Sequence, residues 1–202
     1  MLTGAYNPSG KLTVTFPRHV GQVPIYYALR RGGRPLDPVR PFDLTSYIDN
    51  SSTELYSFAH GLSYTNFEYG PARLSKTRLA GDETLTASVT VTNTGDLEGE
   101  EIAQLYIRQP VGSRTRTLEL KGFKKLLLRP GEKKEFVFTI RQQDLSYPIG
   151  RTIEDVQRAW EPGEFRISIG PNVRALQEAS LFWEPDSAGR VPLRRWLGIA
   201  NG

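Results

Sequence analysis

Hydrophobic and polar residues alternate in a series of short segments that fill the second half of the chain. In residues 84–92 every second side chain is apolar, and the residues between them all carry hydroxyl groups. A period of two is typical of a β-strand with one buried face. Later segments repeat the period, and the side chains expected to face a core are Leu85, Ala87, Val89 and Val91, then Ala103, Leu105 and Ile107, then Phe136, Phe138 and Ile140, and then Phe165, Ile167 and Ile169.

Turn-forming residues separate these segments. Asn93-Thr94-Gly95 follows the first segment, residues 129–132 carry the Pro-Gly pair of a type II turn, and Pro162-Gly163 marks another turn. Residues 122–128 and 180–183 complete the set of strands. The pattern predicts a mainly β protein with an antiparallel, immunoglobulin-like β-sandwich. Because the chain has no cysteine, a disulfide-bonded immunoglobulin domain is excluded and the fibronectin type III-like variety fits better.

The first 72 residues have a different texture. Residues 11–16 alternate once, which predicts a strand that buries Leu12, Val14 and Phe16, and Pro17 ends it. The long stretch that follows is rich in proline, glycine and tyrosine and has little periodicity. Its aromatic content predicts a segment laid over another surface rather than a flexible linker. The residues expected to hold it there are Tyr26, Tyr27, Phe42, Tyr47, Tyr56, Phe58 and Tyr64.

Little helix is expected. The best candidate is residues 153–159, which have Glu154 and Asp155 in the first turn. The tail from residue 185 is irregular, and Trp196 and Leu197 are its candidate docking residues.

No apolar run approaches the roughly 20 residues that span a bilayer, and no signal peptide is expected, so no membrane partner is predicted.

The net charge of +4 raises the question of nucleic-acid binding. The basic residues are scattered, acidic residues interrupt several of their groups, and no known nucleic-acid-binding pattern accompanies them. Ordinary solvated surface is therefore the interpretation, and no nucleic-acid partner is predicted. The groups are Arg30, Arg31 and Arg34; Arg114 and Arg116; Lys121, Lys124 and Lys125; Lys133 and Lys134; and Arg194 and Arg195.

Candidate catalytic chemistry is sparse. Hydrolysis of a glycoside usually needs two flanking carboxyl groups, but the acidic residues fall in turns or at strand positions expected to be exposed; they include Glu100, Glu101, Glu132, Glu161 and Glu164. His19 and His60 are too far apart in sequence to suggest a metal site, and His60 is expected to be packed and hydrogen-bonded. No phosphate-binding loop or nucleophile elbow occurs. We therefore predict no catalytic residue, no cofactor and no metal. Asn50-Ser51-Ser52 fits a glycosylation acceptor, which matters only in a eukaryotic secretory route.

Several segments, in their order, resemble the C-terminal end of glycoside hydrolase family 3, the β-glucosidases and β-xylosidases, and the pattern is closest to bacterial periplasmic β-glucosidases. The three most telling are NPSGKLTVTFP at residues 7–17, HGLSYT at residues 60–65 and EPGEF at residues 161–165. The resemblance runs from Leu2 to about Trp183. It implies that residues 4–12 lead into the last strand of an α/β domain, that residues 21–27 leave that domain, and that residues 58–65 form the junction with a fibronectin type III-like domain.

The resemblance has local departures. The family usually has proline where this chain has Thr13, and Pro-Phe-Gly where this chain has Ser57-Phe58-Ala59. Alanine tolerates a positive φ poorly. Either the turn at Ala59 is not left-handed, or it is strained.

In the family, a barrel domain supplies an aspartate nucleophile and the α/β domain usually supplies a glutamate acid/base. Both are expected upstream of Met1, and no residue here matches either. The expected domains are residues 1–72, the C-terminal remnant of the α/β domain with its linker; residues 73–184, the fibronectin type III-like domain; and residues 185–202, a tail. The sandwich should fold alone, whereas residues 1–72 should be mobile or buried against another copy.

The resemblance thus implies the non-catalytic C-terminal portion of a retaining β-glycosidase with a structural role. Its partners would be the catalytic domains of the parent enzyme or another copy of itself. The alternative is an independent carbohydrate-binding or adhesion module, whose partner would be an oligo- or polysaccharide; a row of exposed aromatic residues would support it. Bacterial members are often periplasmic or secreted, and the sequence itself leaves the compartment open.

Overall fold

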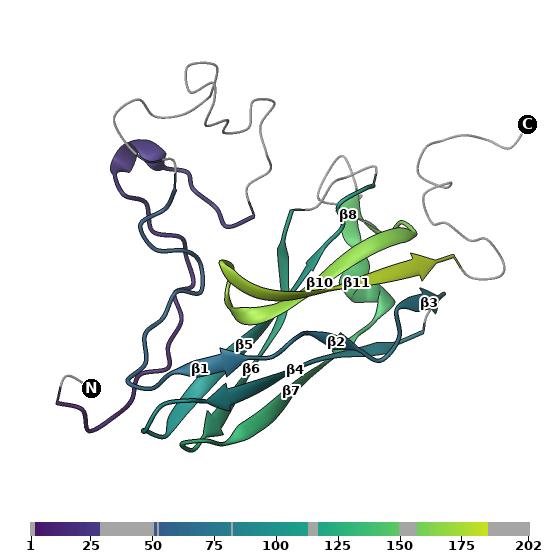
Figure 1. The fold of residues 1–202 in the computed structure, drawn as a ribbon. Helices are drawn as coiled ribbons and strands as arrows, with labels where there is room; N and C mark the ends of the chain where they lie inside the picture. The colour runs from purple at the N-terminus through teal and green to yellow at the C-terminus, as the bar shows by residue number, and fades with distance from the viewer. Residues whose placement is uncertain are drawn as a thin grey trace, which may run out of the picture.

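The computed structural model describes residues 3–28, 51, 53–81, 83–112, 117–149 and 157–185. They form two packed β-sheets with a separate pair of strands (Figure 1). In the first sheet β4 (Leu85–Asn93) pairs with β7 (Lys133–Ile140) and also with β1 (Phe67–Tyr69) and β2 (Arg73–Leu74). The second sheet has the order β3 (Arg78–Ala80), β11 (Ala175–Glu184), β10 (Gly163–Asn172), β5 (Gly99–Arg108) and β6 (Glu119–Leu128).

The pairings are antiparallel except that β3 runs parallel to β11. The remaining elements are short: the 3-10 helix η1 (Val20–Gln22), the helix α1 (Gln142–Leu145), and the strands β8 (Tyr147–Ile149) and β9 (Gln157–Ala159), which pair with each other. The prediction of a mainly β, fibronectin type III-like sandwich is confirmed. The strand β1 precedes residue 73, the boundary expected from the sequence, yet it pairs with β4 of the first sheet.

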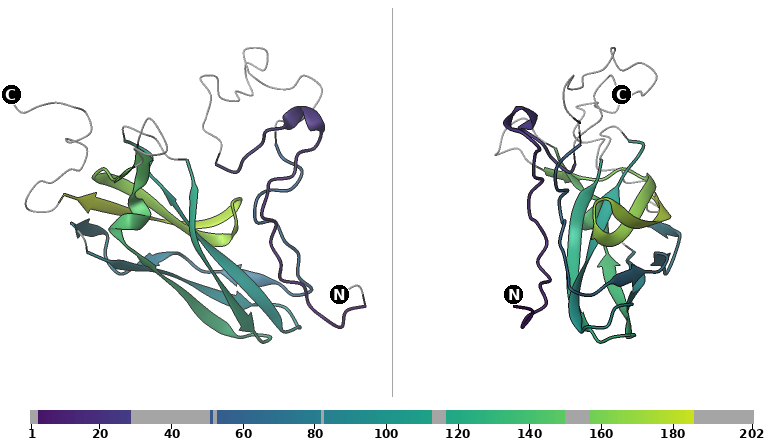
Figure 2. Two further views of the ribbon diagram at one scale, coloured as in Figure 1. Left: turned by 180° about the vertical axis from the view of Figure 1, so that it is seen from behind. Right: turned by 60° about the vertical axis from the view of Figure 1, so that its left-hand side comes forward.

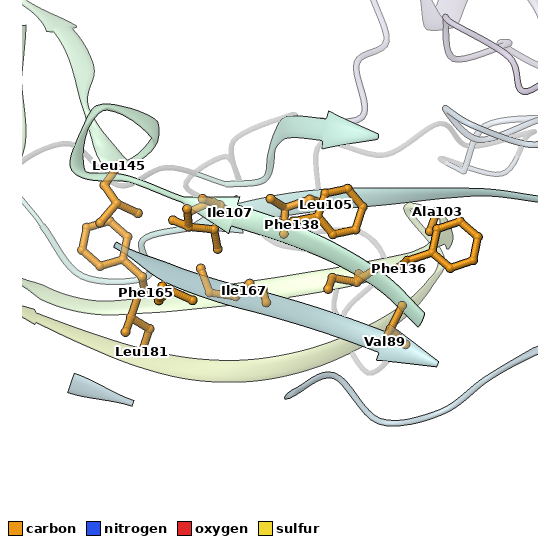
Figure 3. Close-up of a cluster of buried hydrophobic side chains, with 14 of the residues drawn as sticks. Val89, Ala103, Leu105, Ile107, Phe136, Phe138, Leu145, Phe165, Ile167 and Leu181 are labelled. Atoms are coloured by element: carbon orange, nitrogen blue, oxygen red, sulfur yellow. The ribbon is translucent and has the colours of Figure 1, made fainter. Parts of the chain in front are cut away.

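The core lies between the two sheets (Figure 3). Each side chain that the alternation predicted to face inward is buried, with at most 5% of its surface exposed. Trp183 and Trp160 add the largest rings and meet edge to face, with centroids 6.2 Å apart. The full burial of one large aliphatic or aromatic side chain contributes roughly 1.5–3 kcal/mol, so this layer is the main source of stability.

The turn at residues 129–132 has the predicted type II geometry. Gly131 has φ of 74°, and the Glu132 N–H donates to the Arg129 carbonyl at 2.9 Å. A positive φ at this position is what the turn requires and what glycine adopts without strain. The neighbouring Gly131 N–H donates to the Asn93 carbonyl at 2.9 Å, which fixes this turn against the end of β4.

The predicted helix at residues 153–159 is wrong in its described part. Residues 157–159 form β9 and pair with β8, and residues 153–156 lie outside the described residues. A helix of two turns has few internal hydrogen bonds to offset its nucleation, whereas pairing with β8 satisfies the backbone at once. Other residues named in the sequence predictions also lie outside the described residues. They are Phe42 and Tyr47, Asn50 and Ser52 of the glycosylation pattern, several arginines of the basic groups, and Trp196 and Leu197.

Residues 3–28 and 53–64 run side by side along the sandwich, as both views in Figure 2 show. Backbone hydrogen bonds join them: the Leu12 N–H donates to the His60 carbonyl at 2.8 Å, and the Phe16 N–H to the Tyr56 carbonyl at 2.9 Å. We call this pair of segments the N-terminal ribbon. The strand predicted at residues 11–16 is wrong, because only Phe16 forms a ladder bridge, with Tyr56.

The predicted burial in this stretch is wrong for Val14 and Phe16, whereas Leu12 is half-buried. Val14 is 57% exposed and Phe16 is 42% exposed, whereas Lys11, which was expected on the opposite face, keeps only 12% of its side chain exposed. In this stretch the ribbon thus turns Lys11 toward the sandwich and leaves Val14 and Phe16 largely exposed. Attachment to its own sandwich is an arrangement that neither expectation for this segment foresaw.

The turn at Ala59 is left-handed, with φ of 64°, and the residue is fully buried. We expect Ala59→Val to weaken the closure of the ribbon by about 2 kcal/mol, because a β-branched residue is poorly tolerated at positive φ and the added methyls must displace neighbours. Hydrogen exchange at the Leu12 amide measures this closure, and about thirtyfold faster exchange is expected.

The matched control is Ala59→Gly. Glycine relieves the left-handed conformation but removes one buried methyl, worth about 0.8 kcal/mol. These effects oppose each other, so the Leu12 exchange rate should stay within about fivefold of the parent's. Equal exchange in the valine and glycine variants would show that the backbone conformation at Ala59 does not control the ribbon.

Candidate functional site

The segments that carry the family resemblance meet at one place, the junction between the N-terminal ribbon and the sandwich. The Asn7 side chain lies at the end of this junction that is next to the turn between β4 and β5. Its Oδ1 accepts from the Ser63 Oγ at 3.0 Å and from the Tyr64 N–H at 2.8 Å, and its Nδ2 donates to the Glu98 carbonyl at 3.0 Å. One amide therefore joins residues 7, 63–64 and the turn between β4 and β5.

Asn93 continues this network into the core. Its side chain is fully buried, and its Oδ1 accepts from the Thr65 Oγ1 at 2.7 Å and from the Gly95 N–H at 3.1 Å. Its Nδ2 donates to the carbonyls of Leu97 at 2.7 Å and Leu128 at 3.0 Å. All four hydrogen-bonding positions of the amide are used, so the sandwich holds the junction motif at residue 65 in a fixed position.

A buried ion pair lies in the middle of the junction. The Lys11 Nζ is 3.2 Å from the Glu101 Oε1, and the exposed fractions of the two side chains are 12% and 4%. The period of two along β5 places Glu101 on the core-facing side with Ala103. The Tyr69 hydroxyl donates to the same carboxylate at 2.8 Å. Burial, together with this carboxylate, raises the pKa of Tyr69, so its hydroxyl keeps the proton that it donates.

Aromatic contacts attach the upper part of the ribbon. The Tyr27 ring stacks on Phe58, with centroids 4.3 Å apart, and meets Tyr106 of β5 edge to face at 6.2 Å. The Leu120 N–H of β6 donates to the Tyr27 hydroxyl at 3.2 Å. Tyr106 is fully buried although it lies on the outer face of β5. Of the aromatic residues expected to hold this segment on another surface, Tyr27 therefore lies on this sandwich with Phe58 stacked on it, while Tyr26, Tyr56 and Tyr64 remain about half exposed.

A second ion pair joins the ribbon to the turn between β10 and β11. The Arg174 Nε and Nη2 donate to the two Glu54 oxygens at 2.7 and 2.5 Å. Beside this pair lies a cavity of about 110 Å³, which Thr15, Tyr26 and Leu118 help to line. The hydrogen bond from Arg174 is the main cause that lowers the pKa of Glu54, and burial opposes it.

The Glu54–Arg174 contact should be acid-sensitive. Because the folded pKa of Glu54 lies below its unfolded value, the contact contributes stability above the unfolded carboxyl pKa of about 4.3 and loses it as the pH falls through the folded value. Unfolding measured between about pH 6 and pH 3 should therefore lose less stability in Glu54→Gln than in the parent.

The difference between the two proteins isolates this contact, since other carboxyl groups with a lowered pKa are present in both. Hydrogen bonds from Lys76 and Lys125 lower the pKa of Glu83 and Glu100, and the Arg129 backbone N–H, followed by Lys134, lowers that of Glu132. Added salt should shrink the difference, because Arg174 is 62% exposed. Parallel stability curves for the parent and Glu54→Gln across this range would contradict the prediction.

The remaining candidate residues from the sequence fall into two groups. Glu100, Glu132 and Glu164 are partly exposed and paired with cations, as expected for solvated carboxylates. The same expectation is wrong for Glu101 and Glu161, which are 3% and 9% exposed. Glu161 accepts from the Tyr147 hydroxyl at 2.7 Å, so a tertiary partner compensates its burial.

His60 is half-buried and its ring stacks on Tyr56, with centroids 4.9 Å apart, so its predicted packing is confirmed. Within the described residues, no group of three His, Asp or Glu side chains could hold a metal ion. In the same part of the chain, no helix combines the length and the apolar character that crossing a bilayer requires. The absence of catalytic, cofactor and metal residues stays a prediction.

The fold and the junction define a fibronectin type III-like sandwich with the N-terminal ribbon attached to it. Comparison with protein families agrees: residues 1–64 match the glycosyl hydrolase family 3 C-terminal domain, and residues 101–173 match the fibronectin type III-like domain. The chain belongs to glycoside hydrolase family 3 and corresponds to a C-terminal portion of such proteins.

Two curated relatives illustrate the match. The chain is 41% identical over 182 residues to a periplasmic beta-glucosidase of Salmonella typhimurium and 40% identical over 180 residues to a beta-xylosidase of Formosa agariphila. The alignments cover 89% and 87% of this chain but only 23% of each relative. The chain thus spans about a quarter of the length of these relatives.

Solved structures give the same result. A β-glucosidase from Erythrobacter marinus superposes with a TM-score of 0.79 at 40% identity, over 91% of this chain and 23% of that one. A beta-glucosidase from Listeria innocua in complex with glucose superposes with a TM-score of 0.80 at 31% identity, over 92% of this chain and 25% of that one. The fold of both the ribbon and the sandwich is therefore shared with β-glucosidases.

Proposed function

We propose that this chain is the non-catalytic C-terminal part of a family 3 β-glycosidase, and that its junction presents the N-terminal ribbon to the catalytic part of that enzyme. One observation carries the proposal. The ribbon is two-sided: Lys11, Asn7 and Tyr27 bind it to the sandwich, whereas Val14, Phe16 and Tyr56 are 42–57% exposed. A preceding α/β domain is the natural cover for those side chains.

The energetic argument supports a partner for this surface. Full burial of a valine, a phenylalanine or a similar side chain contributes roughly 1.5–3 kcal/mol. Two of the exposed side chains of the ribbon lie close together: Phe16 and Tyr56 form a β-bridge, and their rings are 6.3 Å apart. Leu55, the neighbour of Tyr56 in the chain, is also 47% exposed. An exposed patch of this kind is typical of a protein–protein contact.

The lack of catalysis is tested with the purified chain. It should not hydrolyse an aryl β-glucoside, because the carboxyl pair for that reaction is expected in other domains. Among the described residues, Glu101 and Glu161 are buried carboxylates and the Glu54 side chain is 13% exposed, and each has a structural partner. Hydrolysis that persists after removal of contaminating host enzyme would overturn the proposal.

The partner is tested by adding a family 3 β-glucosidase that has been shortened before the region matching this chain. The two should form a stable complex on size-exclusion chromatography. Val14→Asp with Phe16→Asp should abolish the complex, whereas Val111→Asp, at a site that is 77% exposed between β5 and β6, should not. A dimer of this chain, with no binding of the shortened enzyme, would instead assign the ribbon to a second copy.

The alternative function, an independent carbohydrate-binding module, has little support from the sheets. In the described strands, Phe123 of β6 and Phe182 of β11 are exposed aromatic residues, but β10 and β5 separate their strands. The Arg78 guanidinium also covers the Phe182 ring, 4.9 Å from its centroid. The two rings do not form a row on which a polysaccharide chain would stack.

A further inference from the structure

A groove of about 410 Å³ lies at the lower end of the junction, where residues 4–7, Tyr64 and the turn between β4 and β5 meet. Its size is within the range of small-molecule sites. Several of its walls are exposed apolar or aromatic side chains: Tyr6 at 52%, Leu97 at 52% and Leu127 at 45%. The carboxylate residues Glu98 and Glu100 lie among them.

Tertiary contacts determine the shape of this groove. Asn7 lies in one wall, and its side chain binds the other two, through Tyr64 with its neighbour Ser63 and through the Glu98 carbonyl. Gly99 allows the close approach, because a Cβ there would lie 2.7 Å from the Asn7 Nδ2 and 2.8 Å from the Thr65 Cγ2. The groove is thus formed before a ligand arrives, which lowers the entropic cost of binding.

The charges in the groove are balanced. The Glu100 carboxylate pairs with Lys125 and accepts from the Ser9 Oγ at 3.2 Å, and Glu98 lies 3.7 Å from the Arg129 Nε. A strongly charged ligand would gain little from such a surface. Ionised carboxylates accept hydrogen bonds and do not donate them, so the groove favours a neutral ligand with several hydroxyl donors.

We propose that this groove binds a neutral pyranoside, with one face of a sugar ring on Tyr6 and its hydroxyl groups donating to Glu98. A pyranose combines an apolar C–H face with a rim of hydroxyl groups, which matches an aromatic wall beside carboxylate acceptors. The residues that line the groove do not include Val14 or Phe16, whose substitution tests the proposed contact with a catalytic domain, so the two proposals can fail separately.

Calorimetric or NMR titration of the full chain with cellobiose, and separately with xylobiose, tests the proposal. Saturable binding of at least one disaccharide is expected, with a Kd on the order of 1 mM for a small open site. Tyr6→Ala should weaken binding by about fivefold to tenfold through loss of the ring. Glu98→Gln should also weaken it, whereas Tyr6→Phe should retain binding within about twofold because the ring remains.

The control variant is Tyr26→Ala, which removes a tyrosine of similar exposure, 59%, beside the 110 Å³ cavity. It should leave binding unchanged, and sorbitol, a polyol without a pyranose ring, should not bind. Absence of saturable binding by both disaccharides would overturn the proposal. Binding that Tyr6→Ala and Glu98→Gln leave intact would overturn it as well, because the sugar would then bind elsewhere.

Discussion

Asn93→Asp should lower the free energy of unfolding of the sandwich by about 3–5 kcal/mol at neutral pH. The substitution replaces the Nδ2 donor with an oxygen that faces the Leu97 and Leu128 carbonyls, which now accept at 2.7 and 3.0 Å. Both carbonyls lose a hydrogen bond, and a carboxylate is introduced at a fully buried position. Denaturant unfolding measures the change as a fall in the midpoint at constant slope.

The matched control is Asn66→Asp, the same chemical change at an exposed residue of the neighbouring segment. Surface substitutions of this kind usually change stability by less than about 0.5 kcal/mol. A similar midpoint for the two variants would mean that the Asn93 amide does not hold the junction together. Thr65→Val should reproduce only part of the Asn93→Asp effect, because it removes a single donor, at 2.7 Å from the Asn93 Oδ1.

Lys11→Met should cost about 3 kcal/mol, because it leaves the Glu101 carboxylate buried with the Tyr69 hydroxyl in place of two partners. The loss should appear as release of the ribbon, measured by hydrogen exchange at the Leu12 amide, as well as in global unfolding. Lys76→Met provides the control. Its partner Glu83 is 44% exposed, and exposed pairs contribute about 0–1 kcal/mol.

A compensated variant separates loss of charge from loss of packing. When Glu101→Leu and Tyr69→Phe accompany Lys11→Met, no buried polar group is left without a partner. The triple variant should recover most of the stability, since apolar replacements of a buried ion pair are often neutral or stabilising. A triple variant as unstable as Lys11→Met alone would contradict this electrostatic explanation.

The strands of the sandwich were predictable because one strong rule governs them. Leu85, Val89, Phe136 and Ile167 lie on sheets with one face toward a common core, so a period of two appears in the sequence. The type II turn at Gly131 was predictable for the same kind of reason, since its positive φ is a local requirement. Short elements such as β1, β2 and α1 carry too few residues to show a period, and the sequence did not predict them.

The ribbon was not predictable from alternation. Residues 11–16 alternate as cleanly as a strand, but which face is buried depends on a partner far away in sequence, and Glu101 is 90 residues from Lys11. Glu101 and Glu161 were expected to be solvated because carboxylates usually are. Their burial follows from Lys11, Tyr69 and Tyr147, and no local signal at residues 101 or 161 reports those contacts.

The sequence by itself determined the class of fold, the core of the sandwich and, through the segments at residues 7–17, 60–65 and 161–165, the family. Those features depend on local periodicity and on residues whose types are directly readable. Only the tertiary structure showed why two of those segments and the Asn93 turn belong together: Asn7 binds Ser63 and Tyr64, and Thr65 binds Asn93. Side-chain hydrogen bonds and buried ion pairs join residues distant in the chain, and their geometry exists only once the chain has folded.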